Sequence, residues 1–318
     1  MLFVLTNSQD ATASSLIPTL EKSGIAVLRL DTDCLISKIA LSYQPGKPAL
    51  RVDGRWYQPN EVSHIWYRRP EQLKDRCFDN SPESKYARSE WTESVECFFA
   101  HVPAERWLNH PAQNVAASRK LEQLTTACSF GLKIPDTLVT QDPDELRGFY
   151  RKHAGQVVVK PLSTGYIERD GQGSDSLIYT NRVQEKHLEN LADLAVCPTL
   201  FQQLVPKRND VRITVVDSDI HAVELLACDA VGKQRCDIRR NNMSDVAYRP
   251  ISLPTEVQVA LQKLMAHYRL RFGAIDMAVA KNGDWFFFEI NPNGQWAWLD
   301  MTAGTNIAAS FVKAFSTT

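Results

Sequence analysis

Two carboxylates and an amide lie in two strand-like stretches near the carboxyl end of the chain. Asp276 is in the apolar stretch 274–280, and Glu289 and Asn291 close the aromatic stretch 285–291. An Asn-Gly turn separates the stretches and predicts that they form a β-hairpin. Asp276 and Glu289 can then face the same side, and Asn291 shares the face of Glu289 because side chains alternate along a strand.

Oxygen ligands of this kind are those that Mg²⁺ prefers in proteins. Two carboxylates on an otherwise apolar sheet are costly unless a cation neutralises them. The alternative is that both acids lie at strand ends in water, where a single Asp or Glu is usually found. The regular spacing favours a magnesium site with Asp276, Glu289 and Asn291 as ligands.

A lysine at the end of another expected strand is a candidate phosphate ligand. The β-branched run 156–159 leads to Lys160, and a loop with Gly165, Gly171 and Gly173 follows. An ammonium group and flexible backbone N–H groups suit the phosphates of a nucleotide. The loop is not a Walker A motif, and a lysine in this position is more often simply solvated.

Two arginines, Arg68 and Arg69, follow two aromatic residues, Trp66 and Tyr67. A guanidinium group matches the geometry of phosphate or carboxylate, so an anion site is one interpretation. An edge strand with solvated arginines is the other, and the chemistry alone gives them equal weight. The role of these four residues therefore stays open.

Periodicity and turn signals divide the chain into three parts, 1–112, 113–197 and 198–318. The first begins with a strand, a helix and a strand, and the last is mostly β. We expect strands at 2–6, 26–30, 49–52, 65–68, 134–140, 156–160, 200–205, 210–216, 220–228, 274–280 and 284–290. We expect helices at 11–23, 84–101, 116–130, 142–153 and 256–271.

Composition excludes several classes of protein. The formal net charge over 318 residues is -1, so no field of one sign favours nucleic acid. No apolar stretch approaches the roughly 18 residues that a membrane span needs. The seven cysteines form no C-x-x-C pair. We therefore expect a cytoplasmic protein with reduced thiols and assign no role to Cys236.

The order of these parts resembles the ATP-grasp superfamily. The residues that carry the resemblance are Lys120, Val158-Val159-Lys160-Pro161, Phe201-Gln202-Gln203-Leu204-Val205, Asp210-Val211-Arg212, Asp276 and Glu289-Ile290-Asn291-Pro292-Asn293-Gly294-Gln295. Together with Trp66-Tyr67-Arg68-Arg69, they are most similar to the microviridin-type ligases that macrocyclise ribosomal peptides. The resemblance implies an α/β (α+β) fold in which a pre-ATP-grasp domain precedes two subdomains that clasp ATP.

The resemblance also implies roles for particular residues. Lys120 and Lys160 match the two lysines that bind ATP phosphates, and Gln202, Gln203, Leu204 and Val205 match the hinge whose backbone reads adenine. Asp210 is assigned to the nucleotide site as well, and Asp276, Glu289 and Asn291 match the magnesium ligands. Arg212 matches the basic residue near the phosphates, and Asp237 and Arg239 match the Asp-x-Arg stretch near the reacting carboxylate. Two departures, Gln203 in place of an acidic residue and the composition of the loop 163–175, put the ribose contacts in doubt.

The implied activity is an ATP- and Mg²⁺-dependent ligation of a precursor peptide. Asp or Glu side chains would be activated as acyl phosphates and joined to Ser or Thr as esters, or to Lys as amides. The precursor would dock near Arg235, Arg239, Arg240 and Arg249, although a solvated loop explains these arginines nearly as well. The alternatives are a carboxylate–amine ligase of the glutathione-synthetase or glutamate-ligase kind and a nucleotide-binding regulator without catalysis. A homodimer is also implied.

Overall fold

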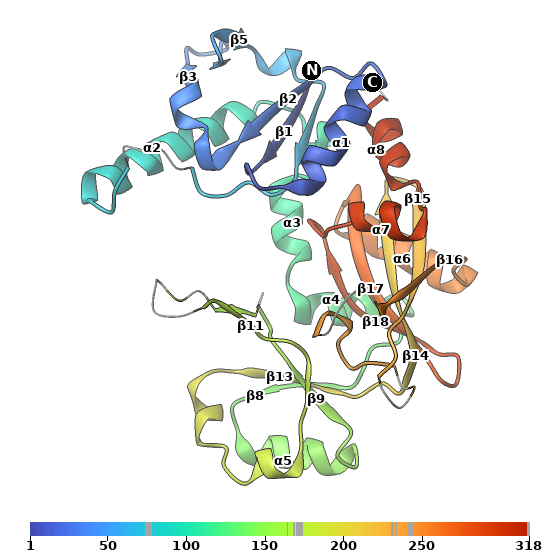
Figure 1. The fold of residues 1–318 in the computed structure, drawn as a ribbon. Helices are drawn as coiled ribbons and strands as arrows, with labels where there is room; N and C mark the ends of the chain where they lie inside the picture. The colour runs from blue at the N-terminus through green and yellow to red at the C-terminus, as the bar shows by residue number, and fades with distance from the viewer. Residues whose placement is uncertain are drawn as a thin grey trace.

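The computed structural model describes residues 1–73, 78–163, 165–167, 169, 174–229, 232, 234–240 and 245–316. Its helices and sheets form three units that follow one another along the chain (Figure 1). The expected mixed α/β fold is confirmed. The expected unit boundaries, at 112/113 and 197/198, stay predictions.

The N-terminal unit is built on a parallel sheet with the strand order β2-β1-β6-β7. The strands are β1 (Leu2–Thr6), β2 (Val27–Asp31), β6 (His64–Tyr67) and β7 (Trp107–Leu108). The helices are α1 (Ala11–Lys22) and α2 (Pro82–Phe99), and a small antiparallel sheet contains β3 (Ile39–Ser42), β4 (Ala49–Val52) and β5 (Arg55–Tyr57). Every residue of β1 is buried, as expected for a central parallel strand.

Two helices, α3 (Pro111–Ala117) and α4 (Lys120–Ser129), connect this unit to the rest of the chain. The single helix expected at 116–130 is therefore wrong at its start. The Ser118 hydroxyl donates to the Asn114 carbonyl, and the Ser118 N–H donates to the Val115 carbonyl. These bonds end α3 and allow Lys120 to begin a new helix.

The central unit is an antiparallel sheet with the order β12-β9-β13-β8. Its strands are β8 (Thr137–Thr140), β9 (Val157–Lys160), β12 (Asn181–Arg182) and β13 (Thr199–Gln203), and helix α5 (Pro143–Lys152) packs on β8. Asp142 caps α5 by accepting from the N–H groups of Asp144 and Glu145. The short strands β10 (Tyr166–Ile167) and β11 (Ser176–Leu177) pair in the glycine-bearing loop, of which Gly171 and Gly173 lie outside the described residues.

The C-terminal unit is a five-stranded antiparallel sheet with the order β16-β15-β14-β17-β18. The strands are β14 (Lys207–Val216), β15 (Asp219–Leu226), β16 (Ala247–Ile251), β17 (Phe272–Ala280) and β18 (Trp285–Asn291), and the helices are α6 (Thr255–His267), α7 (Ala297–Ala303) and α8 (Ile307–Ser316). Ile275, Met277 and Val279 pack in the core that includes α6. Asp276 therefore faces the opposite side of β17.

Helix α8, which the sequence did not predict, lies beside α1 and packs against β14 (Figure 1). Its Phe311 lies 5.3 Å from the Trp66 ring and 4.8 Å from the Trp296 ring, measured between centroids. One hydrophobic core thus joins the N-terminal and C-terminal units. None of the described helices is long and apolar enough to cross a membrane.

Candidate active site

The two acidic residues of the β17–β18 hairpin lie directly opposite each other. Asp276 pairs with Glu289, but Met277 pairs with Phe287, so Phe288 is an extra residue in a β-bulge. The bulge leaves Phe287 and Ile290 buried while Glu289 stays about one-third exposed. The expected facing of Asp276 and Glu289 is confirmed, and Asn291, which pairs with Ala274, lies on the same face as Glu289. The bulge interrupts the alternation only between Phe287 and Glu289.

Helix α4 brings Lys120 to the acidic pair. The Lys120 ammonium lies 3.3 Å from the Glu289 carboxylate and donates to the carbonyls of Pro161 and Ser163, each at 3.2 Å. The buried side chain of Gln123, one turn further along the helix, donates to the Ile290 carbonyl and accepts from the Ile290 N–H, each at 3.0 Å. These bonds fasten α4 to β18.

Lys160 ends β9 as the sequence predicts, and its ammonium lies 4.3 Å from the centre of the Phe288 ring. Such a cation–π contact is electrostatically favourable. Burial lowers the pKa of Lys160 to about 8, although the nearby Glu289 carboxylate acts in the opposite direction. The bulged residue and the strand-terminal lysine therefore belong to one site.

Arg212 of β14 lies opposite Asp276 in the sheet register. Its guanidinium group donates to the Asp276 carboxylate at 2.8 Å and to the Gln295 carbonyl at 3.0 Å. A Cβ at Gly294 would lie 2.8 Å from that guanidinium and 2.3 Å from the Ala274 Cβ. Only glycine fits there, so the turn after β18 can close over Arg212.

The hinge segment connects β13 to β14. Gln202 is buried and its side chain donates to the Thr137 hydroxyl at 3.0 Å, so it does not face a ligand. The N–H groups of Gln203 and Leu204 donate to carbonyls of other loops, each at 2.9 Å. Within the described part of the chain, the Val205 N–H has no hydrogen-bond partner. It is therefore the hinge N–H that could donate to a nucleotide base.

Asp210, assigned from the sequence to the nucleotide site, is held inside the protein. Its carboxylate accepts from the Lys207 ammonium at 2.7 and 2.8 Å and from the Gln234 side chain at 2.8 Å. Burial raises the pKa of Asp210 despite these bonds. Lys207, which the sequence interpretation missed, also donates to the Cys236 carbonyl at 3.1 Å.

Asp237 and Arg239 form a bidentate ion pair with donor–acceptor distances of 3.0 and 2.7 Å. The Thr180 N–H also donates to Asp237, at 3.1 Å. Burial alone would raise the pKa of Asp237, but the bonds from Arg239 and the backbone lower it to about 2. Asp276 and Glu289 both stabilise the charge on Arg239. The Asp237–Arg239 ion pair therefore borders the acidic hairpin.

The donor set fits a hard divalent cation. Asp276 and Glu289 offer two carboxylates, and Asn291 adds an amide whose oxygen accepts from the Asn293 N–H at 2.9 Å. One or two carboxylates with phosphate and water oxygens are usual around Mg²⁺. No group of three His, Cys, Asp or Glu residues occurs in the described ranges, so phosphate oxygens would complete such a site.

Comparisons with known proteins find similarity over the whole chain. The model of the MvdD pre-ATP grasp domain family matches residues 1–115. The macrocyclase MdnC from Microcystis aeruginosa MRC, solved with the precursor peptide MdnA, is 28% identical, with a TM-score of 0.82 over 99% of this chain and 98% of that one. A RiPP-associated ATP-grasp ligase from Chryseobacterium gregarium, solved with ADP and a leader and core peptide, is 28% identical, with a TM-score of 0.85 over 99% of this chain and 96% of that one.

The chain has the ATP-grasp fold and is an ATP-dependent ligase. A glutathione synthetase from Yersinia pestis is similar over part of its length, with 30% identity over 139 residues. That match spans 41% of this chain and 39% of the synthetase. The resemblance to microviridin-type peptide ligases expected from the sequence is confirmed.

The two arginines of the Trp66–Arg69 segment have different environments. Strand β6 lies inside the ligase's parallel sheet, so the edge-strand interpretation is wrong. Arg68 is buried; it lies 3.4 Å from the Asp10 carboxylate and donates to the Asn293 carbonyl at 2.5 Å. Arg69 is exposed. The sequence offered no signal that separates these neighbours.

The arginine-rich segment offers the ligase fewer free cations than expected. Arg235 lies 3.5 Å from the Asp245 carboxylate, and Arg249 is paired with Glu224. Arg239 is paired with Asp237, as described above. The side chain of Arg240 lies outside the described residues. The described arginines are therefore neutralised within the protein.

Proposed function

We propose that this ligase activates Asp or Glu side chains of a ribosomal precursor peptide and joins them to Ser or Thr hydroxyls, or to a Lys amine. The observation that carries the proposal is the full-length likeness to MdnC, which was solved with its precursor peptide. The ligase from Chryseobacterium gregarium, solved with a leader and core peptide, supports the same substrate class.

The nucleotide site is proposed from the geometry of the cleft. Lys120 and Lys160 would hold the ATP phosphates, and the hinge Gln202–Val205 would bind adenine through its backbone. Asp276, Glu289 and Asn291 would hold Mg²⁺, which supplies charge neutralisation for the β- and γ-phosphates. Asp210 would orient Lys207 at the border of the site rather than touch ribose, because both its oxygens are already occupied.

The reaction would have two steps. A substrate carboxylate oxygen attacks the γ-phosphorus, the bond to the β,γ-bridging oxygen breaks, and ADP leaves. The hydroxyl or amine then attacks the acyl carbon, loses its proton and releases phosphate. Arg212 and Arg239 would stabilise the negative charge that develops on the phosphoryl oxygens. Each crosslink removes the elements of one water molecule from the peptide.

Mass spectrometry of the precursor encoded beside this ligase tests the proposal. After incubation with ATP and Mg²⁺, we expect the peptide mass to fall by about 18 Da per crosslink, which is the loss of one water in a ligation driven by phosphoryl transfer. An unchanged mass for every neighbouring short peptide would refute the peptide-ligase function. ADP release with small carboxylate and amine pairs instead would favour the glutathione-synthetase type, for which the partial match is the support.

The oligomeric state is a separate prediction. The resemblance implies a homodimer, and light scattering of the purified ligase would test it. A mass equal to one chain would contradict the implied dimer without affecting the proposed chemistry.

A further inference from the structure

A cavity of about 560 Å³ opens where the N-terminal unit meets helix α3. Asn7 follows β1, and Arg69 and Glu71 follow β6, so the carboxyl ends of two neighbouring parallel strands form one wall. Crevices at the carboxyl ends of parallel strands are where α/β sheets bind ligands. The opposite wall includes Asn114 and Arg119.

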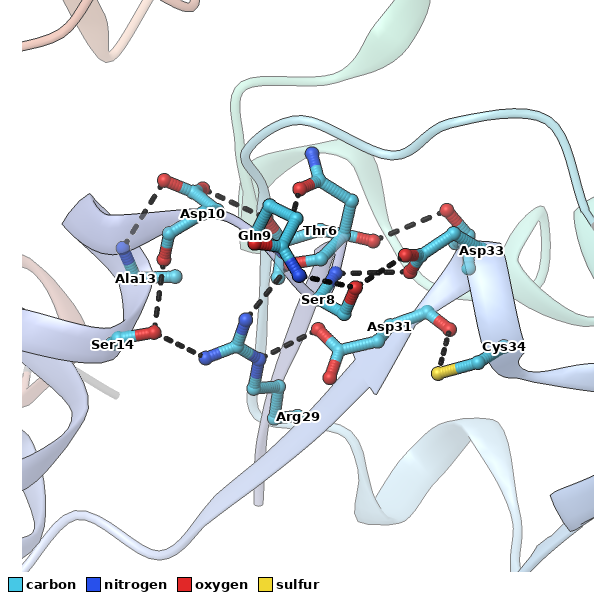
Figure 2. A network of polar contacts seen from close by, with 12 residues as sticks. Thr6, Ser8, Gln9, Asp10, Ala13, Ser14, Arg29, Asp31, Asp33 and Cys34 are labelled. Atoms are coloured by element: carbon cyan, nitrogen blue, oxygen red, sulfur yellow. Dashed lines mark hydrogen bonds and ion pairs between the residues drawn. The ribbon is translucent and has the colours of Figure 1, made fainter.

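Polar bonds fix the wall that Asn7 forms. Arg29 donates to the Asn7 carbonyl at 2.8 Å and to the Asp31 carboxylate at 2.6 Å. Figure 2 shows Arg29 between Ser14 and Asp31, and it shows Ser8, the neighbour of Asn7, joined to Asp33, which follows β2. The Asn7 side chain in turn donates to the Arg69 carbonyl at 2.9 Å. The loops after β1 and β6 therefore hold each other in place before any ligand binds.

The cavity presents positive charge. Arg69 and Arg119 are both exposed, and neither has an ion-pair partner within the described part of the chain. Among the described residues that line the cavity, Glu71 is the one acidic residue. Guanidinium groups match the geometry of carboxylates.

The cavity is separate from the proposed nucleotide site but adjoins it. None of the predicted phosphate or metal ligands lines it. Arg119 directly precedes Lys120, which contacts Glu289. Asn293 lines the cavity and donates its N–H to Asn291. A group bound in the cavity would thus lie one turn of chain away from the proposed metal ligand Asn291.

We propose that this cavity is a subsite for a second acidic side chain of the peptide substrate, next to the one that is activated. Arg69 and Arg119 bind its carboxylate. The subsite fixes which carboxylate reaches the phosphates. This inference rests on the proposed function, because it requires a peptide substrate with more than one acidic residue.

The test is calorimetric titration of the ligase with the precursor peptide and with copies in which one Asp or Glu at a time becomes Asn or Gln. We expect that replacing one particular acidic residue of the peptide weakens its binding to the unmodified ligase about tenfold. The double variant Arg69→Gln/Arg119→Gln should bind that copy and the parent peptide equally well. The matched control is Arg147→Gln/Arg151→Gln on α5, which should keep the tenfold difference. Circular dichroism verifies that each variant is folded.

The subsite is refuted if no single acidic residue affects binding to the unmodified ligase. It is also refuted if the double variant keeps the full tenfold difference. The 18 Da loss, measured with the unmodified ligase in the same samples, reports on the proposed function alone. Mass loss without discrimination would therefore remove the subsite and leave the ligase function standing.

Discussion

Glu289 faces two charges at once, the Lys120 ammonium at 3.3 Å and the Asp276 carboxylate across the sheet. If it binds Mg²⁺, Glu289→Gln should lower ADP release about 100-fold or more, because even partners that only orient a metal ligand typically contribute 10- to 100-fold. The same variant should bind Mn²⁺ more weakly in electron paramagnetic resonance. Glu256→Gln, at an exposed position of α6, should change neither measurement. Normal turnover by Glu289→Gln would exclude the metal role.

Lys160 gives the site a pH dependence. Since burial lowers the pKa of Lys160 to about 8, its ammonium loses the proton as the pH rises through that value, and a neutral amine no longer attracts phosphate. We expect kcat/KM for ATP, which reports the free enzyme, to fall up to tenfold per pH unit above about 8. Lys160→Arg should remove the decline because arginine stays protonated. An identical decline in that variant would show that another group titrates.

At the scale of elements, the bulge in β18 places the Phe288 ring beneath the Lys160 ammonium. Phe288→Leu keeps an apolar side chain but removes the cation–π contact, which is typically worth about 0.5–1 kcal/mol. We expect ADP affinity to fall about two- to fivefold in calorimetric titrations. Phe286→Leu is the matched control, since Phe286 lies on the same strand as Phe288 but pairs with Ala278 of β17, and its substitution should leave the affinity unchanged. Equal effects of both substitutions would assign the loss to strand packing.

Elements that local patterns specify were predicted well. The Asn-Gly turn located the β17–β18 hairpin, and the β-branched run located β9 with Lys160 at its end. The bulge at Phe288 was missed because alternation in the sequence carries no sign of an extra residue. The break between α3 and α4 was missed because Gln123 fixes α4 through Ile290, 167 residues away. Contacts of that range leave no periodic trace.

The same limit applies to the whole molecule. The sequence left open whether Trp66 and Arg68 belong to an anion site, but in the structure both connect units that are distant in sequence. Trp66 packs on Phe311 of α8, and Arg68 donates to Asn293, 225 residues away. Burial lowers the pKa of Arg68 to about 10, and Asp10 opposes that shift. Only the assembled fold distinguishes this structural arginine from its exposed neighbour Arg69.

Arg68 links the N-terminal unit to the active site, because it donates to the Gln295 side chain at 2.6 Å while the Gln295 carbonyl accepts from Arg212. Arg68→Met leaves the fully buried Asp10 carboxylate without its cation, and breaking such a pair typically costs about 3–5 kcal/mol. We expect the free energy of unfolding in urea to fall by about that amount. Arg69→Met, at the adjacent exposed position, should stay within about 0.5 kcal/mol of the unmodified protein. Adding Asp10→Asn to Arg68→Met should recover part of the loss, because it removes the unpaired charge. If Arg68→Met and Arg69→Met destabilise the chain equally, the link does not exist.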